Sequence, residues 1–166
     1  MIVVLMGVSG SGKTRVGRAL AESLDWPFHD ADDFHPPANV AKMAAGIPLT
    51  DDDRWPWLDR IVDSLRQAGA NGGNAVLACS ALRQIYRDRI ARAGNVRFVF
   101  LKGDLATIAE RLAVRAHKYM PASLLPSQFA TLEEPADALV VDIRADIRAK
   151  VATIREGLKL SAANAA

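Results

Sequence analysis

Short apolar runs alternate with stripes of helical periodicity along most of the chain. Residues 2–6 form a continuous β-branched and apolar run that ends at a glycine. This pattern is typical of a strand that is covered on both faces of a parallel sheet. Similar apolar runs recur at residues 75–79, 96–101 and 139–143. The sequence therefore predicts a buried strand at each of these places.

Apolar residues at helical spacing accompany these strands. The stripes comprise Val16, Ala19, Leu20 and Leu24; Trp57, Leu58, Ile61, Val62 and Leu65; Leu105, Ile108 and Leu112; and Ile147, Val151, Ile154 and Leu158. Each stripe predicts a helix, and Asp104 is placed to cap the third of them. Strands that alternate with helices imply right-handed crossovers and a parallel sheet with helices on both faces. We therefore predict a three-layer α/β fold.

Two segments lie outside this alternation, at residues 29–54 and 117–135. The second contains three prolines and shows little periodicity. Long irregular segments in a compact domain usually act as lids or binding loops. We expect a single domain over residues 1–160, with a mobile lid at about 117–135 and a frayed tail at 161–166.

Composition and charge narrow the class of protein. The 166 residues suit one domain, and their 50% hydrophobic and 24% charged content is typical of a globular protein. A formal net charge of +2 gives no reason to expect a nucleic-acid or membrane partner, although a basic cleft for a polyanionic ligand stays compatible with it. Cys79 is the only cysteine, which fits a reducing, cytoplasmic setting, and we expect it to be a small buried filler.

A phosphate-binding pattern, GxxxxGK followed by Ser or Thr, is matched at every constrained position. It comprises Gly7, Val8, Ser9, Gly10, Ser11, Gly12, Lys13 and Thr14, between a predicted strand and a predicted helix. In such a loop, backbone N–H groups and the helix N-terminus bind phosphate oxygens. We expect Lys13 to contact the β- and γ-phosphates of ATP, and the Thr14 hydroxyl to bind the Mg²⁺ that bridges them.

The loop alone leaves open whether the terminal phosphoryl group passes to water or to an acceptor. The NKxD-type element and the switch segments of a GTPase are not found in the sequence, and a motor or transporter ATPase is normally larger. A small-molecule kinase therefore remains as the main prediction. A nucleotide-binding regulatory protein without turnover is an alternative from another class.

Acidic residues follow a further predicted strand at residues 26–29. Asp30 and Asp32 come directly after it, and we expect this strand to lie next to the strand at residues 2–6, where ligands bind in such sheets. Asp32 is a candidate base for an attacking hydroxyl. Asp30 is a candidate for holding the metal, because no carboxylate directly follows the strand at residues 75–79. A solvated acidic turn is the alternative interpretation.

Three arginines are candidates for binding anionic groups. Arg54 follows a run of aspartates that is typical of a capped first turn of a helix, and its guanidinium group suits a carboxylate bidentately. Arg111 and Arg115 lie four residues apart on one predicted helix. Cations of this kind stabilise charge on a transferring phosphoryl group. Each of the three is equally compatible with an ordinary solvated surface residue.

Together these features resemble the gluconokinase family of P-loop carbohydrate kinases, over nearly the whole chain. Beyond the phosphate loop, the resemblance is carried by DADDFHPPAN at residues 30–39, KMAAGIPLTDDDRWPWL at 42–58, CSALRQIYRD at 79–88, FVFLKGD at 98–104 and LLPSQFATLEEP at 124–135. It implies a P-loop kinase fold similar to that of shikimate and adenylate kinases. It also implies a homodimer that uses ATP and Mg²⁺ to phosphorylate D-gluconate to 6-phospho-D-gluconate.

The resemblance also implies roles for individual residues on the acceptor side. Asp32 looks like the base for the acceptor hydroxyl. The pocket for the sugar acid would be lined by His35, Arg54, Ser80 and Arg83, with Arg54 meeting the carboxylate.

On the nucleotide side, the resemblance implies lid-side phosphate contacts for Arg111 and Arg115, and a place in the closing lid for Gln128. Residues 142–145 stand where such kinases pack the adenine.

One position departs from the family pattern. The family usually shows Gly-His-Phe before the Met-Pro of the lid, whereas this chain has His117, Lys118 and Tyr119 there. Lys118 therefore stands in the place of the histidine, where it could replace it as a cation, or His117 could swing in. A changed acceptor preference is the other possibility, which leaves a different small hydroxylated acid, such as shikimate or another sugar acid, as an alternative substrate.

Overall fold

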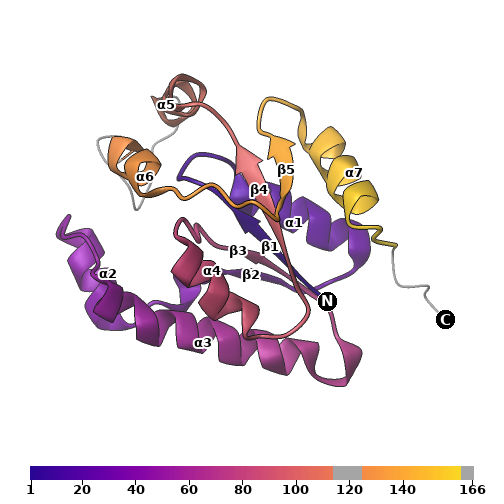
Figure 1. The fold of residues 1–166 in the computed structure, drawn as a ribbon, viewed down its shortest axis with the longest axis horizontal. Helices are drawn as coiled ribbons and strands as arrows, with labels where there is room; N and C mark the ends of the chain where they lie inside the picture. The colour runs from indigo at the N-terminus through magenta and orange to yellow at the C-terminus, as the bar shows by residue number, and fades with distance from the viewer. Residues whose placement is uncertain (114–124, 162–166) are drawn as a thin grey trace.

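The computed structural model describes residues 1–113 and 125–161, and its centre is a parallel sheet of five strands (Figure 1). In spatial order the strands are β2 (Phe28–Asp30), β3 (Ala75–Ala78), β1 (Ile2–Met6), β4 (Val96–Lys102) and β5 (Leu139–Asp142). All neighbouring strands pair in parallel. The strands predicted from the apolar runs and the α/β class are therefore confirmed.

The predicted position of β2 next to β1 is wrong. β3 lies between them, with Val4 of β1 paired to Leu77 and Phe28 of β2 paired to Val76. The chain leaves β2, passes through the long helix α3 (Asp51–Gly69) and returns as β3 between β2 and β1. Because all carboxyl ends of parallel strands still meet at one edge of the sheet, the residues after β2 remain close to the phosphate loop.

Helices cover both faces of the sheet (Figure 1). α1 (Lys13–Leu24) and α7 (Ile147–Gly157) pack on one face, and α3 and α4 (Gln84–Ala91) pack on the other. This arrangement explains the continuous apolar run of β1. Val3 and Leu5 belong to the core beneath α1, whereas Ile2, Val4 and Met6 belong to the core beneath α3.

Three short α-helices lie where periodicity predicted none. They are α2 (Pro37–Ala44), α4 and α6 (Leu125–Thr131), which contain eight, eight and seven residues. The segment at residues 29–54 is therefore not irregular, because it also holds the 3₁₀-helix η1 (Ala31–Phe34) and the first turn of α3. A helix of about two turns shows too few apolar repeats to be identified by periodicity.

The predicted helix starts agree with the structure. α3 begins after Thr50 with a capping box, in which the Asp53 backbone N–H donates to the Thr50 hydroxyl and the Asp53 carboxylate accepts from the Thr50 backbone N–H. Hydrogen bonds from Lys42 and Thr50 lower the pKa of Asp53 to about 2. Asp104 caps α5 (Leu105–Ala113) by accepting the backbone N–H of Thr107 at 2.8 Å.

The single cysteine lies in the core. Cys79 is buried, and desolvation raises the pKa of its thiol to about 12, which confirms it as a core filler.

Figure 1 shows α2, α5 and α6 at the end of the sheet where the strands finish, away from the N-terminus. Within residues 1–113 and 125–161, no helix is both long enough and apolar enough to cross a membrane.

Candidate functional site

The predicted phosphate loop connects β1 to α1 and has a conformation that its glycines allow. Gly7, Gly10 and Gly12 have φ angles of 141°, 82° and 94°, in the region that favours glycine. A Cβ atom at Gly7 would lie 2.9 Å from the carbonyl oxygen of Leu101, and one at Gly10 would lie 2.9 Å from the side chain of Leu112. These two positions therefore need glycine for space as well as for backbone conformation.

Lys13 lies against this loop. Its Nζ donates hydrogen bonds to the carbonyl oxygens of Gly7 and Val8, both at 2.9 Å. Burial lowers the pKa of Lys13, and the negative charges of Asp32 and Asp30 oppose that shift. The ammonium group is thus held between the phosphate loop and the acidic residues that follow β2.

Gln128 of α6 contacts the same loop. Its Oε1 accepts the backbone N–H of Ser9 at 2.7 Å. Leu125, at the start of α6, is buried in the core beneath α1 and so fixes the helix to the rest of the domain. The residue that was assigned to the lid by resemblance therefore lies directly on the phosphate loop.

Thr14 and Asp30, the two residues predicted to hold Mg²⁺, are hydrogen bonded to each other. The Thr14 hydroxyl donates to Asp30 Oδ2 at 2.9 Å, and Asp30 Oδ1 accepts the backbone N–H of Asp32 at 3.2 Å. A hydroxyl and a carboxylate beside a phosphate loop suit Mg²⁺, which is usually bound by one or two protein groups together with substrate phosphates. Among the described residues, no cluster of three or more His, Cys, Asp or Glu side chains could hold a metal.

Asp32 projects from η1 into the site, and 74% of its side chain is open to solvent. Its pKa is raised, first because the surrounding protein removes part of its hydration and second because Asp30 is negative; Lys13 opposes the shift. A carboxylate with a raised pKa accepts a proton more readily than an ordinary aspartate does. The environment of Asp32 therefore suits a general base.

His35 lies beside Asp32 as a neutral imidazole. Its ring stacks on Trp57, with centroids 4.4 Å apart and an interplanar angle of 11°, and its Nε2 is 4.0 Å from Asp32 Oδ1. The side chain is only 5% exposed. This burial, together with the positive charge of Arg54, lowers the pKa of His35 to about 4. A neutral imidazole can donate one hydrogen bond and accept another.

Arg54 and Arg83, which were both assigned to the acceptor pocket, converge in space. Arg54 lies on α3, and Arg83 is the residue before α4. Each guanidinium carbon lies 5.5 Å from the centroid of the Tyr86 ring. Asp51 contacts both arginines. The structure therefore brings together two cations that the sequence places on separate segments.

Ser80 and Arg83 belong to a tight turn after β3. Ala81 has a φ angle of 44°, which is uncommon for a residue other than glycine and has a conformational cost. The buried Arg87 of α4 supports this turn, because its Nη1 donates to the carbonyl oxygen of Ala81 at 2.9 Å. The Ser80 carbonyl oxygen accepts the backbone N–H of Gly7 at 3.3 Å, which joins the turn to the phosphate loop. Arg87 was not among the residues predicted for the site.

A cavity of about 770 Å³ opens between the phosphate loop, α5 and the start of α7. Arg111 lines it and donates from Nη2 to the carbonyl oxygen of Ile143 at 2.9 Å. Ala145, from the segment assigned to adenine, also lines it. Arg15 and Lys150 line the cavity too, although neither was predicted from the sequence. A basic residue on an amphipathic helix is ordinarily solvated, so nothing in the sequence marks Lys150 as a site residue. In the structure Lys150 is only 5% exposed.

Two predicted residues, Arg115 and Lys118, lie at positions 114–124, outside the described residues. Their predicted contacts with phosphate or substrate stay predictions. The same holds for the first part of the segment predicted to be a lid.

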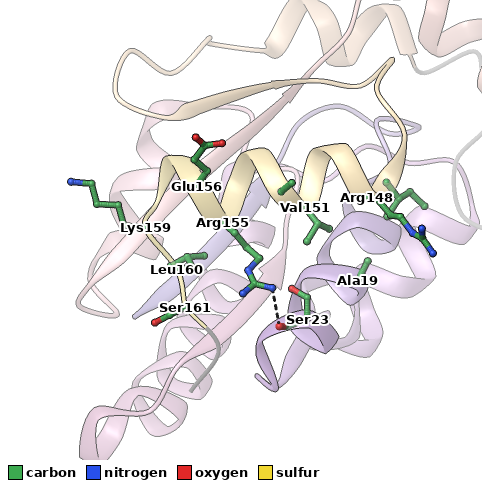
Figure 2. A pocket seen from close by; sticks show the side chains of 11 residues that line it. Ala19, Ser23, Arg148, Val151, Arg155, Glu156, Lys159, Leu160 and Ser161 are labelled. Carbon is green, nitrogen blue, oxygen red and sulfur yellow. Dashed lines mark hydrogen bonds between the residues drawn. The ribbon is translucent and has the colours of Figure 1, made fainter. Parts of the chain in front are cut away.

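A second cavity, of about 660 Å³, lies between α1 and α7 (Figure 2). Ala19 and Val151 contribute apolar walls, and Arg155 donates a hydrogen bond to the carbonyl oxygen of Ser23 at 3.3 Å. None of the residues predicted for the site lines this cavity. The candidate site residues therefore lie outside this cavity.

Comparisons with known proteins agree with this geometry. A model of the shikimate kinase family matches residues 9–153. Together with the parallel sheet and the phosphate loop, this match defines the chain as a P-loop small-molecule kinase.

Individual relatives identify the family of this chain within that class of kinases. A gluconokinase from Gluconobacter oxydans (strain 621H) is 51% identical over 137 residues, which cover 81% of this chain and 76% of the relative. The crystal structure of a gluconokinase from Sinorhizobium meliloti 1021 is 43% identical with a TM-score of 0.84, over 95% of this chain and 90% of that one. A sugar kinase from Janibacter sp. HTCC2649 is 40% identical with a TM-score of 0.89, over 96% and 95%. The chain belongs to the gluconokinase family, as the resemblance predicted.

Proposed function

We propose that this protein transfers the terminal phosphoryl group of ATP to D-gluconate and forms 6-phospho-D-gluconate. The observation that carries this proposal is the hydrogen bond of 2.9 Å between the Thr14 hydroxyl and Asp30, because it joins the acidic residues after β2 to the phosphate loop. Gluconokinases that are 51% and 43% identical to this chain support gluconate as the acceptor. The reaction is an in-line phosphoryl transfer, in which a protein contributes mainly positioning and charge.

The nucleotide side holds ATP through backbone and cations. The N–H groups of residues 7–14 bind phosphate oxygens, and Lys13 places its charge at the β- and γ-phosphates. Arg111 and Ala145, the latter from the segment assigned to adenine, line the cavity that would take the base and ribose. Thr14 and Asp30 are the candidates for holding Mg²⁺, which neutralises charge on the phosphates when it is bound.

The acceptor side orients gluconate and activates its primary hydroxyl. Asp32 accepts the proton of that hydroxyl as the oxygen attacks the terminal phosphorus atom. Arg54 and Arg83 receive the carboxylate, for which the planar guanidinium fork is well suited. Nε2 of the neutral His35, whose Nδ1 lies 3.4 Å from the Asn39 amide nitrogen, and the hydroxyl of Ser80 are available for hydrogen bonds to the hydroxyl groups of the sugar acid.

The proposal also includes a lid that closes over the phosphates and the assembly of the chain into a dimer. Gln128, which is bonded to the phosphate loop through Ser9, is our candidate for a lid contact that shields the phosphates from water. We also propose a homodimer, as the resemblance to gluconokinases implies, and a cytoplasmic location, because a single cysteine suits a reducing compartment. Size-exclusion chromatography with light scattering tests the dimer, since it should give twice the mass of the 17.9 kDa chain.

An acceptor panel tests the function directly. ADP release is followed in a coupled assay with D-gluconate, other sugar acids, shikimate and nucleoside monophosphates, and with no acceptor. We expect ADP release that depends on gluconate at millimolar concentration, with 6-phospho-D-gluconate identified by mass spectrometry. A preference for shikimate or another acid would overturn the gluconate assignment and leave the kinase class intact. Tight ATP binding without ADP release on any acceptor would instead support a regulatory nucleotide-binding protein.

A further inference from the structure

Asp51, the first residue of α3, joins side chains from two helices. Its Oδ1 accepts a hydrogen bond from the Tyr86 hydroxyl of α4 and lies 3.6 Å from Nη1 of Arg54. Its Oδ2 accepts from Nη1 of Arg83 at 2.6 Å. One carboxylate therefore bridges both arginines that the proposed function assigns to the acceptor.

The two guanidinium groups need such a bridge. Arg54 and Arg83 both lie over the Tyr86 ring, 5.5 Å from its centroid, so two like charges are held on one aromatic side chain. Two like charges that contact the same ring and the same carboxylate repel each other. The hydrogen bonds from Tyr86 and Arg83 lower the pKa of Asp51, so the bridging carboxylate remains ionised at neutral pH.

The bridge leaves part of each guanidinium group for a ligand. The hydrogen bond of Arg83 to Asp51 is made by Nη1, and the contact of Arg54 with Asp51 also involves Nη1. The Nε of Arg83 is also 3.7 Å from Glu133, while Arg54 has no other ion pair among the described residues. The remaining N–H groups can therefore bind a second carboxylate.

Helix capping does not explain the contacts of the Asp51 side chain. The capping box of α3 is formed by Thr50 and Asp53. Asp52 supplies a further negative charge in the first turn, is exposed, and makes no hydrogen bond or ion pair with any described residue. The favourable interaction of acidic residues with the helix dipole is therefore shared by neighbours, whereas the contact with the two arginines belongs to Asp51.

We infer that Asp51 is a positioning residue that, with Tyr86, holds Arg54 and Arg83 side by side as a paired receptor for the carboxylate of the acceptor. This inference rests on the proposed function and adds to it. Asp51 does not touch the reacting atoms, so its removal should weaken acceptor binding and leave the nucleotide side unchanged.

The test compares Asp51→Asn with Asp52→Asn in steady-state assays that vary gluconate and ATP separately. Both changes remove one negative charge from the first turn of α3, but only the first removes the bridge. We expect Asp51→Asn to raise the KM for gluconate about tenfold, with the KM for ATP within about twofold of wild type. Asp52→Asn should change neither value by more than about twofold. Asp51→Glu, which restores the charge, should recover part of the loss.

Tyr86→Phe is the second variant, because it keeps the ring and removes only the hydroxyl that bonds Asp51. We expect it to raise the KM for gluconate about threefold to fivefold. If circular dichroism shows that Asp51→Asn is unfolded, Tyr86→Phe becomes the deciding variant. An unchanged KM for gluconate in Tyr86→Phe then overturns the inference. Equal KM values in Asp51→Asn and Asp52→Asn also overturn it. A wild-type protein that is inactive on gluconate but active on another acceptor instead refutes the proposed function, and is recognised before any variant is compared.

Discussion

The nucleotide side and the acceptor side of this site are built in different ways. The phosphate loop is one uninterrupted stretch, residues 7–14, and we propose that its backbone N–H groups bind most of the phosphate oxygens. The proposed acceptor side gathers side chains from separate elements, with Asp32 on η1, Arg54 on α3 and Arg83 before α4. A backbone cradle serves any nucleoside triphosphate, whereas a set of side chains can be matched to one acceptor. Changes on the two sides should therefore affect different kinetic constants.

The largest effect is expected at Lys13. In Lys13→Met, the charge at the transferring phosphoryl group is lost, and kcat should fall by about 10³ for every acceptor that the wild type uses. Lys159→Met, beyond the end of α7 and away from the phosphate loop, is the matched control and should retain activity. A loss of less than about tenfold in Lys13→Met would contradict the role of this lysine.

The next effect is expected at Asp32. Asp32→Asn removes the proton acceptor, so kcat should fall by about 10² while the Kd for ATP, measured by calorimetry, stays the same. Asp33→Asn is the control, because Asp33 is the adjacent carboxylate of η1, is exposed and makes no hydrogen bond or ion pair with a described residue. Equal losses of turnover and ATP affinity in Asp32→Asn would remove it from the role of base.

A smaller effect is expected at Arg54. Arg54→Lys keeps the positive charge but loses the planar fork, so the KM for gluconate should rise about tenfold with little change in the KM for ATP. Arg60→Lys, an exposed position on the same helix, should behave as wild type. If the KM for gluconate does not change in Arg54→Lys, Arg54 does not meet the carboxylate.

The smallest effect concerns stability and comes from His35. Its pKa is about 4 in the folded protein, below the ordinary value of 6.5, so the unfolded chain binds more protons between these values. Stability should therefore fall as the pH falls through this window, by about 2 kcal/mol between pH 7 and pH 5. Urea denaturation at both pH values checks this. His35→Gln should show a smaller pH dependence by about that amount, and identical pH dependence would refute the buried neutral histidine.

Much of the fold could be predicted because its signals are local. The run at residues 2–6, the phosphate loop and the stripe of α1 lie next to one another in the chain, and each has one structural interpretation. The position of β2 could not be predicted, because a strand of three residues carries no signal for its neighbour. Three short helices, α2, α4 and α6, could not be predicted for a related reason. Helices of about two turns are stabilised mainly by tertiary packing.

On the proposed acceptor side, the roles of single residues could not be predicted from the sequence either. Asp51, Asp52 and Asp53 are alike in sequence, and all three suit the start of a helix. In the structure, Asp53 completes the capping box, Asp52 faces solvent and Asp51 contacts Arg83. Spacing along the chain cannot separate these roles, because the partners of Asp51 on the other side of the site, Arg83 and Tyr86, come from the start of α4.

The sequence by itself determined the nucleotide side. Residues 7–14 and the helix that follows specify their own backbone, since glycine allows the turn and Lys13 and Thr14 are fixed one after the other at its end. Only the tertiary structure decided how the residues proposed for the acceptor meet. Arg54 and Arg83 share one carboxylate and one aromatic ring because α3 and α4 pack together on the same face of the sheet, and that packing depends on contacts far apart in the chain.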